Sequence, residues 1–172
     1  MATFDVKGPF QVPMVRLATG VNIVDETKEH VREFWNNTGV KERRGCYVLA
    51  IKAAKGYTPI YVGRASTLRF DAEVLNDRNL KNCNRVLADR RKGALCVFLL
   101  PIRVARGKLN KKHIADVEEY LIGQAARKNK DLINTRLLPD SPWSITGLVN
   151  SGQGQPPLSS QELKWALGIK TA

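Results

Sequence analysis

Residues 45–63 have the sequence GCYVLAIKAAKGYTPIYVG. They contain two apolar segments, 46–51 and 60–63, that are rich in Val, Ile and Tyr. The loop between these segments contains Gly56 and Pro59, both of which favour turns. Short segments of this composition on either side of turn-forming residues are typical of a β-hairpin. The sequence therefore predicts two paired strands here, and the other predicted elements are arranged around them.

Each predicted strand contains a tyrosine. Side chains alternate between the two faces of a strand, so Tyr47 shares a face with Leu49 and Ile51. Tyr61 lies two residues before Gly63, where the chain leaves the second predicted strand. Tyrosines with apolar neighbours are usually core aromatics whose hydroxyl groups are hydrogen-bonded. Without further information, this pattern favours a structural role for both rings.

The composition indicates a globular domain with a polyanionic partner. Of the 172 residues, 43% are hydrophobic and 26% are charged, which is ordinary for a chain that buries a core. The net charge of +12 favours nucleic acid first and an acidic membrane surface second. The longest uncharged apolar run, residues 94–102, is too short to span a bilayer, and residues 1–10 lack the layout of a secretion signal. We therefore expect a cytoplasmic protein without membrane attachment, and the sequence leaves its oligomeric state open.

The three cysteines, Cys46, Cys83 and Cys96, are odd in number and widely spaced. No CxxC motif is present, and only His30 and His113 could complete a zinc site. This pattern predicts buried free thiols instead of a disulfide scaffold or a zinc finger.

Helical signals flank the hairpin. Residues 25–37 are predicted to form a helix that is capped by Asp25 or Thr27 and ends at Gly39. Residues 1–24 show no clear periodicity, and we expect them to form a partly ordered arm that lies over the domain.

Two helices and a strand are predicted after the hairpin. Ser66 is expected to cap the first helix, which would contain Leu68, and the second helix is expected around residues 80–91. Residues 94–102, ALCVFLLPI, predict a central strand that is buried on both faces. Pro101 has no amide donor, so it should lie near the end of that strand.

Residues 111–128 give the clearest helical pattern. The apolar residues that define its buried stripe are Ile114, Val117, Leu121 and Ala125. Glu118 lies on this stripe, whereas Glu119 points about 100° away. A carboxylate on an apolar face is costly unless it is paired with a cation or bound to a metal. Pairing with one of the many arginines and a functional role for Glu118 both remain open at this point.

The C-terminal part of the chain gives shorter signals. Residues 131–136 are expected to return to the sheet, and residues 144–149 predict an edge strand. Ser159 and Glu162 together predict a capping box for a last short helix.

Three pieces of the sequence resemble motifs of the GIY-YIG nuclease superfamily. Gly45-Cys46-Tyr47 and Tyr61-Val62-Gly63 resemble its paired signature, with Cys and Val in place of the two isoleucines. Glu118, followed by Leu121 and Ile122, is similar to the metal-binding glutamate of the family, and Asn134 is similar to the asparagine that closes its motif.

The resemblance covers about residues 45–136 and implies an α+β fold, with a small antiparallel β-sheet of about three core strands flanked by α-helices. Residues 1–172 would form a single domain around this core. Residues 1–44 would be an N-terminal arm and helix, and residues 137–172 a C-terminal accessory segment.

The resemblance also implies a divalent-metal-dependent endonuclease. Glu118 would be the protein ligand of a Mg²⁺ or Mn²⁺ ion, and water and phosphate oxygens would complete the coordination. Tyr47 and Tyr61 would orient or deprotonate the attacking water. A free tyrosine has a pKa near 10, so a nearby cation would have to lower the pKa of such a base. The residues expected to support the site are Gly45, Gly63 and Asn134.

The sequence departs from the family at the catalytic arginine. The family has an arginine ten residues after the second tyrosine, and this position is Asp71 here. Arg69 is expected to replace it from the first turn of a helix, with Asp71 about 200° around that helix and facing elsewhere. Arg64 is expected to hold a phosphate that flanks the cleaved one. If neither arginine serves, the chain would be a catalytically inactive nucleic-acid-binding module.

The positive charge is concentrated in residues 64–112, which contain thirteen Lys and Arg against four Asp and Glu. We expect this region to bind phosphates, with DNA preferred to RNA as the partner, although charge alone does not distinguish the two. The residues expected to bind nucleic acid are Arg64, Arg90, Arg91, Lys92, Lys108, Lys111 and Lys112. The remaining alternative is that the motifs are coincidental, the basic face is merely solvated, and Tyr47 and Glu118 are structural.

Overall fold

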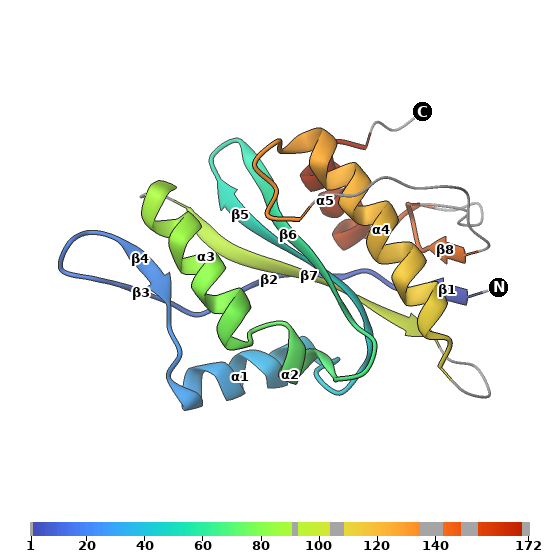
Figure 1. Cartoon of the computed structure of the whole chain (residues 1–172), viewed down its shortest axis with the longest axis horizontal. Helices are drawn as coiled ribbons and strands as arrows, with labels where there is room; N and C mark the ends of the chain where they lie inside the picture. The colour runs from blue at the N-terminus through green and yellow to red at the C-terminus, as the bar shows by residue number, and fades with distance from the viewer. Residues whose placement is uncertain (1, 91–92, 104–108, 135–142, 149–154, 170–172) are drawn as a thin grey trace.

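The computed structural model of the chain has a central β-sheet with helices on both faces (Figure 1). The structure describes residues 2–90, 93–103, 109–134, 143–148 and 155–169. The strands of the main sheet are β1 (Ala2–Phe4), β2 (Lys7–Gln11), β5 (Gly45–Ala53), β6 (Gly56–Ala65), β7 (Ala94–Arg103) and β8 (Trp143–Ile145). Within the described residues this sheet has six strands in the order β6-β5-β7-β1-β8, and β2 also pairs with β7. The predicted α+β class is therefore confirmed.

The predicted hairpin and the predicted central strand are both confirmed. β5 pairs antiparallel with β6 on one side and with β7 on the other, which places Tyr47 opposite both Gly63 and Leu99. β7 is buried from Leu95 through Ile102. β5 and β7 are the longest interior strands. Each has a strand on both sides and a hydrophobic core on both faces, which explains why they are buried.

The N-terminal segment is part of the sheet, so the predictions of a loose arm and of about three core strands are wrong. β1 and β2 pair antiparallel with successive parts of β7, with Phe4 opposite Ile102 and Gln11 opposite Cys96. β8 pairs parallel with β1. A separate two-stranded sheet, β3 (Met14–Arg16) and β4 (Asn22–Val24), follows. Strands of three to five residues are too short to give a periodic signal in the sequence.

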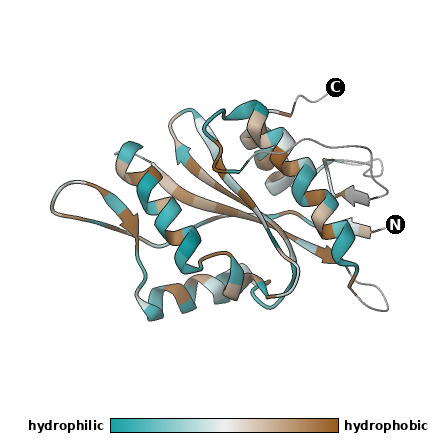
Figure 2. Cartoon of the chain, viewed as in Figure 1, coloured by the Kyte–Doolittle hydropathy of each residue, from teal (hydrophilic) through white to brown (hydrophobic). Residues whose placement is uncertain are grey.

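Two hydrophobic cores lie on opposite faces of the main sheet. The helices on one face are α1 (Lys28–Thr38), α2 (Phe70–Glu73) and α3 (Asp77–Arg90), and those on the other are α4 (Lys111–Lys128) and α5 (Leu158–Leu167). Tyr47 and Leu49 pack with the α1–α3 layer, whereas Val48 and Val62 pack with the α4–α5 layer. Figure 2 shows that the interior strands are mostly hydrophobic, as burial on both faces requires.

α4 has the bounds predicted from its periodicity. All four residues of the predicted stripe are fully buried, namely Ile114, Val117, Leu121 and Ala125. Asn110 caps the helix, because its side chain accepts a hydrogen bond from the backbone amide of Lys112 at 3.0 Å. The buried stripe fixes the rotation of α4 over β5 and β6, and this rotation determines where Glu118 points.

α1 ends at Gly39 as predicted, in the left-handed conformation with φ of 66°, but it begins at Lys28 instead of residue 25, and Thr27 precedes it without a side-chain cap hydrogen bond. The prediction that Ser66 caps the next helix is wrong. α2 has only four residues and follows Arg69, and the Leu68 side chain is exposed. The backbone amide of Phe70 donates to the carbonyl of Arg43 instead, so a contact with a distant loop sets the start of α2.

Two further helix starts differ from the sequence predictions. α3 begins at Asp77, because the side chain of Asn76 accepts a hydrogen bond from the backbone amide of Asn79 at 3.0 Å. α5 begins at Leu158 without the predicted capping box. The hydroxyl of Ser159 donates to the carbonyl of Val6 at 2.9 Å and so ties α5 to the N-terminal strands.

Candidate active site at the β6 edge

β6 is an edge strand whose outer backbone groups are bonded by residues 129–134 instead of by another strand, with the Ile133 amide donating to the carbonyl of Ile60 at 3.0 Å. The Nδ2 of Asn134 donates to the carbonyl of Val62 at 2.6 Å, and its Oδ1 accepts from the Val62 amide at 3.2 Å. The Nδ2 of Asn129 donates to the carbonyl of Pro59 at 2.8 Å. A primary amide offers one donor and one acceptor side by side, as a neighbouring strand would. Residues 129–134 therefore cover this part of the β6 edge.

Tyr47 and Tyr61 lie together on the face that α3 covers. Their ring centroids are 6.0 Å apart. Tyr47 is only 1% exposed, and its hydroxyl accepts a hydrogen bond from Nδ2 of Asn79 at 2.9 Å. Burial raises the pKa of both tyrosines, and the negative charge of Glu118 raises the pKa of Tyr61 further. In this state both hydroxyl groups stay protonated at neutral pH, contrary to the expectation of a lowered pKa.

The two motif glycines are needed for steric reasons. A Cβ atom on Gly63 would overlap the ring of Tyr47, which lies directly across the hairpin. A Cβ atom on Gly45 would overlap the carbonyl of Leu100 in β7, and Gly45 has a φ of 156°. The glycines therefore let the Tyr47 ring lie flat over β6 and let β5 approach β7 closely.

Glu118 approaches β6 from the other face of the sheet. Its Oε2 atom lies 3.4 Å from Nε of Arg64, and the two side chains are 18% and 46% exposed. Arg64 is paired in register with Cys46, whose side chain packs in the α4 core. The Glu118 carboxylate is also close enough to Tyr61 to raise its pKa. β6 therefore presents Tyr61 on the α3 side of the sheet and the Arg64–Glu118 pair on the α4 side, three residues further along the same edge strand.

The predicted position of Arg69 is wrong. Its Nη2 atom donates to Oδ2 of Asp71 at 3.1 Å, and its Nη1 atom lies 3.8 Å from a carboxylate oxygen of Glu42. The expectation that Asp71 faces away assumed a helix that contains both residues. Arg69 instead precedes α2 in an extended conformation, and this conformation brings the two side chains together.

Arg78 and Asn79, the second and third residues of α3, were not predicted as site residues. The positive charge of Arg78 lowers the pKa of Tyr61, which opposes the effect of Glu118. Asn79 is buried, and its Nδ2 atom donates to the hydroxyl of Tyr47. Recognising Asn76 as a helix cap would have revealed both residues, because it places the start of α3 next to the hairpin tyrosines.

Glu118 can supply one ligand to a hard divalent cation. In the part of the chain that the structure describes, no group of three or more His, Cys, Asp or Glu side chains could hold a metal ion. Mg²⁺ does not require such a group, because one or two carboxylates with waters and phosphate oxygens suffice. The Arg64 guanidinium contacts the same carboxylate and would share it with the cation. The residues present thus fit an ion whose coordination is completed by water and substrate.

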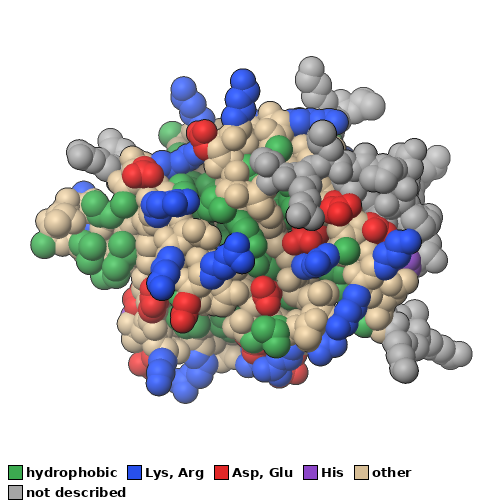
Figure 3. Space-filling model, viewed as in Figure 1, with side chains coloured by type: hydrophobic (Ala, Val, Ile, Leu, Met, Phe, Trp, Pro, Cys, Tyr) green, Lys and Arg blue, Asp and Glu red, His purple; other side chains and the backbone are tan. Residues whose placement is uncertain are grey.

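Four of the predicted nucleic-acid-binding residues lie in the part of the chain that the structure describes. Arg64, Lys111 and Lys112 are exposed, and Nζ of Lys111 donates to the hydroxyl of Thr67 at 3.1 Å. Arg90 is exposed at the end of α3. In Figure 3, Lys and Arg side chains lie on both sides of a strip of hydrophobic atoms between α3 and α4. The other predicted binding residues, Arg91, Lys92 and Lys108, lie outside the described residues.

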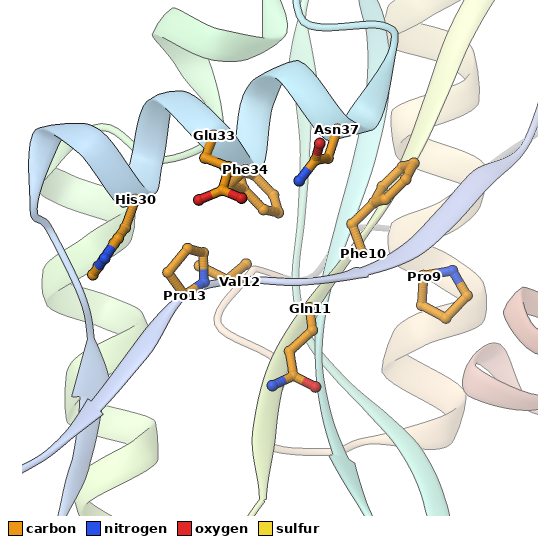
Figure 4. Close-up of a pocket in the computed structure, with 9 residues that line it drawn as sticks. All are labelled: Pro9, Phe10, Gln11, Val12, Pro13, His30, Glu33, Phe34 and Asn37. Atoms are coloured by element: carbon orange, nitrogen blue, oxygen red, sulfur yellow. The ribbon is translucent and has the colours of Figure 1, made fainter.

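A cavity of about 490 Å³ lies elsewhere, between β2 and α1 (Figure 4). Its described lining consists of Pro9, Phe10, Gln11, Val12, Pro13, His30, Glu33, Phe34 and Asn37. Nδ1 of His30 lies 2.7 Å from Oδ2 of Asp25, and this contact raises the pKa of the imidazole. Hydrogen bonds from Thr27, and to a smaller extent the contact with His30, lower the pKa of the Asp25 carboxyl to about 2. The described lining includes no residue of the candidate active site.

In the described part of the chain, no helix is both long and apolar enough to cross a membrane. A scan against protein-family models, a search of curated proteins and a search of solved structures each found no match to this chain. Membership of the GIY-YIG superfamily therefore remains a prediction from the motifs.

Proposed function

We propose that this chain is a divalent-metal-dependent endonuclease that hydrolyses phosphodiester bonds in DNA. The observation that supports this function best is the Arg64–Glu118 pair at the β6 edge, three residues from Tyr61 in a strongly basic chain. Phosphodiester hydrolysis needs a positioned water, charge neutralisation on the phosphate and help for the leaving oxygen. A phenol, a guanidinium and a carboxylate together suit these tasks.

Arg64 and Arg78 are the proposed phosphate-binding groups. Arg64 extends from β6 on the α4 side, and Arg78 acts on Tyr61 from the α3 side. A phosphate between them would receive positive charge from two directions, and a guanidinium can bind two phosphate oxygens at once. Glu118 would hold the divalent cation, and the bound cation would supply further charge neutralisation on the phosphate.

Tyr61 is the proposed water-binding hydroxyl, and Tyr47 is a positioning residue. Tyr61 is half-buried and lies under the influence of both Glu118 and Arg78. Because its pKa is raised, it would orient the water through a hydrogen bond and would not remove a proton from it at neutral pH. Tyr47 is buried and accepts a hydrogen bond from Asn79, and its ring lies beside that of Tyr61, so it would help to position the Tyr61 ring.

The second candidate function is a nucleic-acid-binding module without catalysis. Arg69 is paired with Asp71 and Glu42, and Arg64 is paired with the carboxylate proposed to hold the metal. If these pairs persist when nucleic acid binds, phosphate would be bound but not cleaved.

Incubation of the protein with supercoiled plasmid, single-stranded DNA and single-stranded RNA separates these functions. Each substrate is tested with Mg²⁺, with Mn²⁺ and with EDTA, and binding is measured in EDTA by gel shift. The nuclease predicts cleavage of DNA that needs the metal. Binding without cleavage would favour the module, and the absence of both would show that the motifs are coincidental.

A further inference from the structure

A cavity of about 650 Å³ lies beside β6, between α3 and residues 129–133. Its inner wall is apolar and includes the buried side chains of Ile60 and Leu132, with the half-buried Val86 beside them. A volume of this size is within the usual range for small-molecule sites. The apolar wall implies that the occupant has at least one apolar face.

The rim of the cavity carries two positively and two negatively charged side chains. Arg85 and Arg90 come from α3, and they are accompanied by the carboxylates of Asp89 and Asp131. All four side chains are exposed. A phosphate group here would be repelled by two carboxylates as well as attracted by two guanidinium groups. The rim is therefore better suited to a neutral group that carries both hydrogen-bond donors and acceptors.

A nucleobase has these properties. Its ring faces are apolar enough to lie against Ile60 and Val86, and a guanidinium such as that of Arg85 stacks on aromatic rings. The carboxylates of Asp89 and Asp131 can accept hydrogen bonds from exocyclic amino groups, which adenine, cytosine and guanine present. The chemistry of the wall and the rim thus matches a base better than a phosphate.

The cavity is connected to the candidate active site along one face of α3. Arg78, which acts on Tyr61, and Arg85, which lines the cavity, are seven residues apart, so they lie within about 20° on the helix surface and about 10 Å apart along it. Lys81 lies between them and is exposed. This length corresponds to about three stacked nucleotides at about 3.4 Å each. One strand can therefore pass Arg78 and Lys81 and place a base in the cavity.

We propose that this cavity binds an unpaired nucleobase of the strand that enters the candidate active site. The preferred substrate would then be DNA with a single-stranded overhang or flap, because a base inside a duplex must be unpaired and unstacked before it can enter a pocket. The inference rests on the proposed function for the position of the strand, but it does not require that the strand is cleaved.

The test measures binding in EDTA, where cleavage cannot contribute. Fluorescence anisotropy compares a blunt DNA duplex, the same duplex with a single-stranded overhang, and the same overhang with abasic sites. Stacking and desolvation of one base predict that the normal overhang binds about tenfold tighter than either of the other two. Equal affinity for all three ligands, or equal affinity for the normal and abasic overhangs, would overturn the proposal.

Two substitutions locate the effect. Val86→Trp should fill the cavity and remove the preference for the overhang while leaving the affinity for the blunt duplex unchanged. Ala88→Trp introduces the same ring at an exposed position of the same helix and serves as the control. Arg85→Ala, at an exposed position that should not disturb folding, is the second variant and should also reduce the preference. Retention of the full preference in both Val86→Trp and Arg85→Ala would contradict the proposed site.

These affinities, read together with cleavage of the same substrates in Mg²⁺, separate this inference from the proposed function. A base-dependent preference without metal-dependent cleavage would support the cavity and refute only the nuclease. Cleavage without any base-dependent preference would refute the cavity and leave the nuclease in place.

Discussion

The Nε atom of Arg64 lies 3.4 Å from Oε2 of Glu118, and this contact joins the end of β6 to the middle of α4. Glu118 is therefore paired with an arginine, as one alternative required. The pair also lies where the other alternative expected a functional site. The pair is partly exposed, and such ion pairs contribute little to folding stability. A role in binding accounts for this arrangement better than a role in stabilising the fold.

The stability of single variants tests this interpretation. Arg64→Ala and Glu118→Gln should each change the free energy of unfolding by at most about 1 kcal/mol, because solvent screens a partly exposed pair. Urea denaturation followed by circular dichroism measures this change. A loss of about 3 kcal/mol or more in either variant would instead indicate a buried structural pair whose remaining partner is left uncompensated.

The two tyrosines should respond differently to loss of the hydroxyl group. Tyr61→Phe should lower the cleavage rate by about 10²-fold, the usual scale for a hydroxyl that handles the attacking water, with little change in stability. Tyr47→Phe removes the acceptor of the Asn79 hydrogen bond and should cost about 1 kcal/mol of stability. Single-turnover rates and urea denaturation of both variants distinguish the roles. Cleavage at the wild-type rate by Tyr61→Phe would show that the Tyr61 hydroxyl has no role in catalysis.

The hairpin, β7 and α4 could be predicted from the sequence because their signals are local and repeated. The alternation around Tyr47, the apolar run of β7 and the stripe that contains Val117 are each set by neighbouring residues. β1 and β2 could not be predicted, since they are short and their pairing depends on β7, about ninety residues away in the chain.

The cations of the candidate site could not be predicted for a similar reason. The start of α2 depends on backbone hydrogen bonds from Phe70 and Asp71 to residues 41 and 43, which no local pattern shows. An error of a few residues in a helix start decides whether a residue near that start is helical or extended, and this conformation sets which side chains it contacts. This error is why Arg69 was expected in the site and Arg78 was overlooked.

The two arginines provide a direct comparison. Arg78→Ala should lower the cleavage rate by about 10³-fold, because removing one positive group from a phosphate in the transition state costs several kcal/mol. Arg69→Ala should have little effect on the rate, since Arg69 is paired with Asp71. Both substitutions remove one exposed arginine from neighbouring segments, so each controls for the loss of charge. A large loss of cleavage rate in Arg69→Ala, with little loss in Arg78→Ala, would show that Arg69 and not Arg78 acts in the site.

The pair between His30 and Asp25 predicts a defined pH dependence. The raised pKa of His30 means that its contribution to stability is complete below pH 6.5 and is lost as the pH rises through the folded-state value. The pKa of Asp25 is lowered to about 2 by hydrogen bonds from Thr27 and, to a smaller extent, by His30, so its contribution is complete above about pH 4 and is lost as the pH falls toward 2. The pair therefore contributes most between about pH 4 and pH 6.5.

An NMR titration of the His30 imidazole checks this prediction. The midpoint should lie above the ordinary value of about 6.5 in the wild type and should return toward that value in Asp25→Asn. Glu26→Gln removes a neighbouring carboxylate that does not contact His30 and should leave the midpoint unchanged. An unchanged midpoint in Asp25→Asn would show that the 2.7 Å contact does not persist in solution.

We propose that Glu118 holds the metal ion for phosphodiester cleavage. The most direct test of this role compares the Glu118→Gln variant with the Glu119→Gln variant. Single-turnover cleavage of DNA is measured with saturating Mg²⁺, and DNA affinity is measured in EDTA. We predict that Glu118→Gln abolishes cleavage while it still binds DNA, and that Glu119→Gln, which lies about 100° away on α4, cleaves at close to the wild-type rate. Metal-dependent cleavage at the wild-type rate by Glu118→Gln would contradict the account.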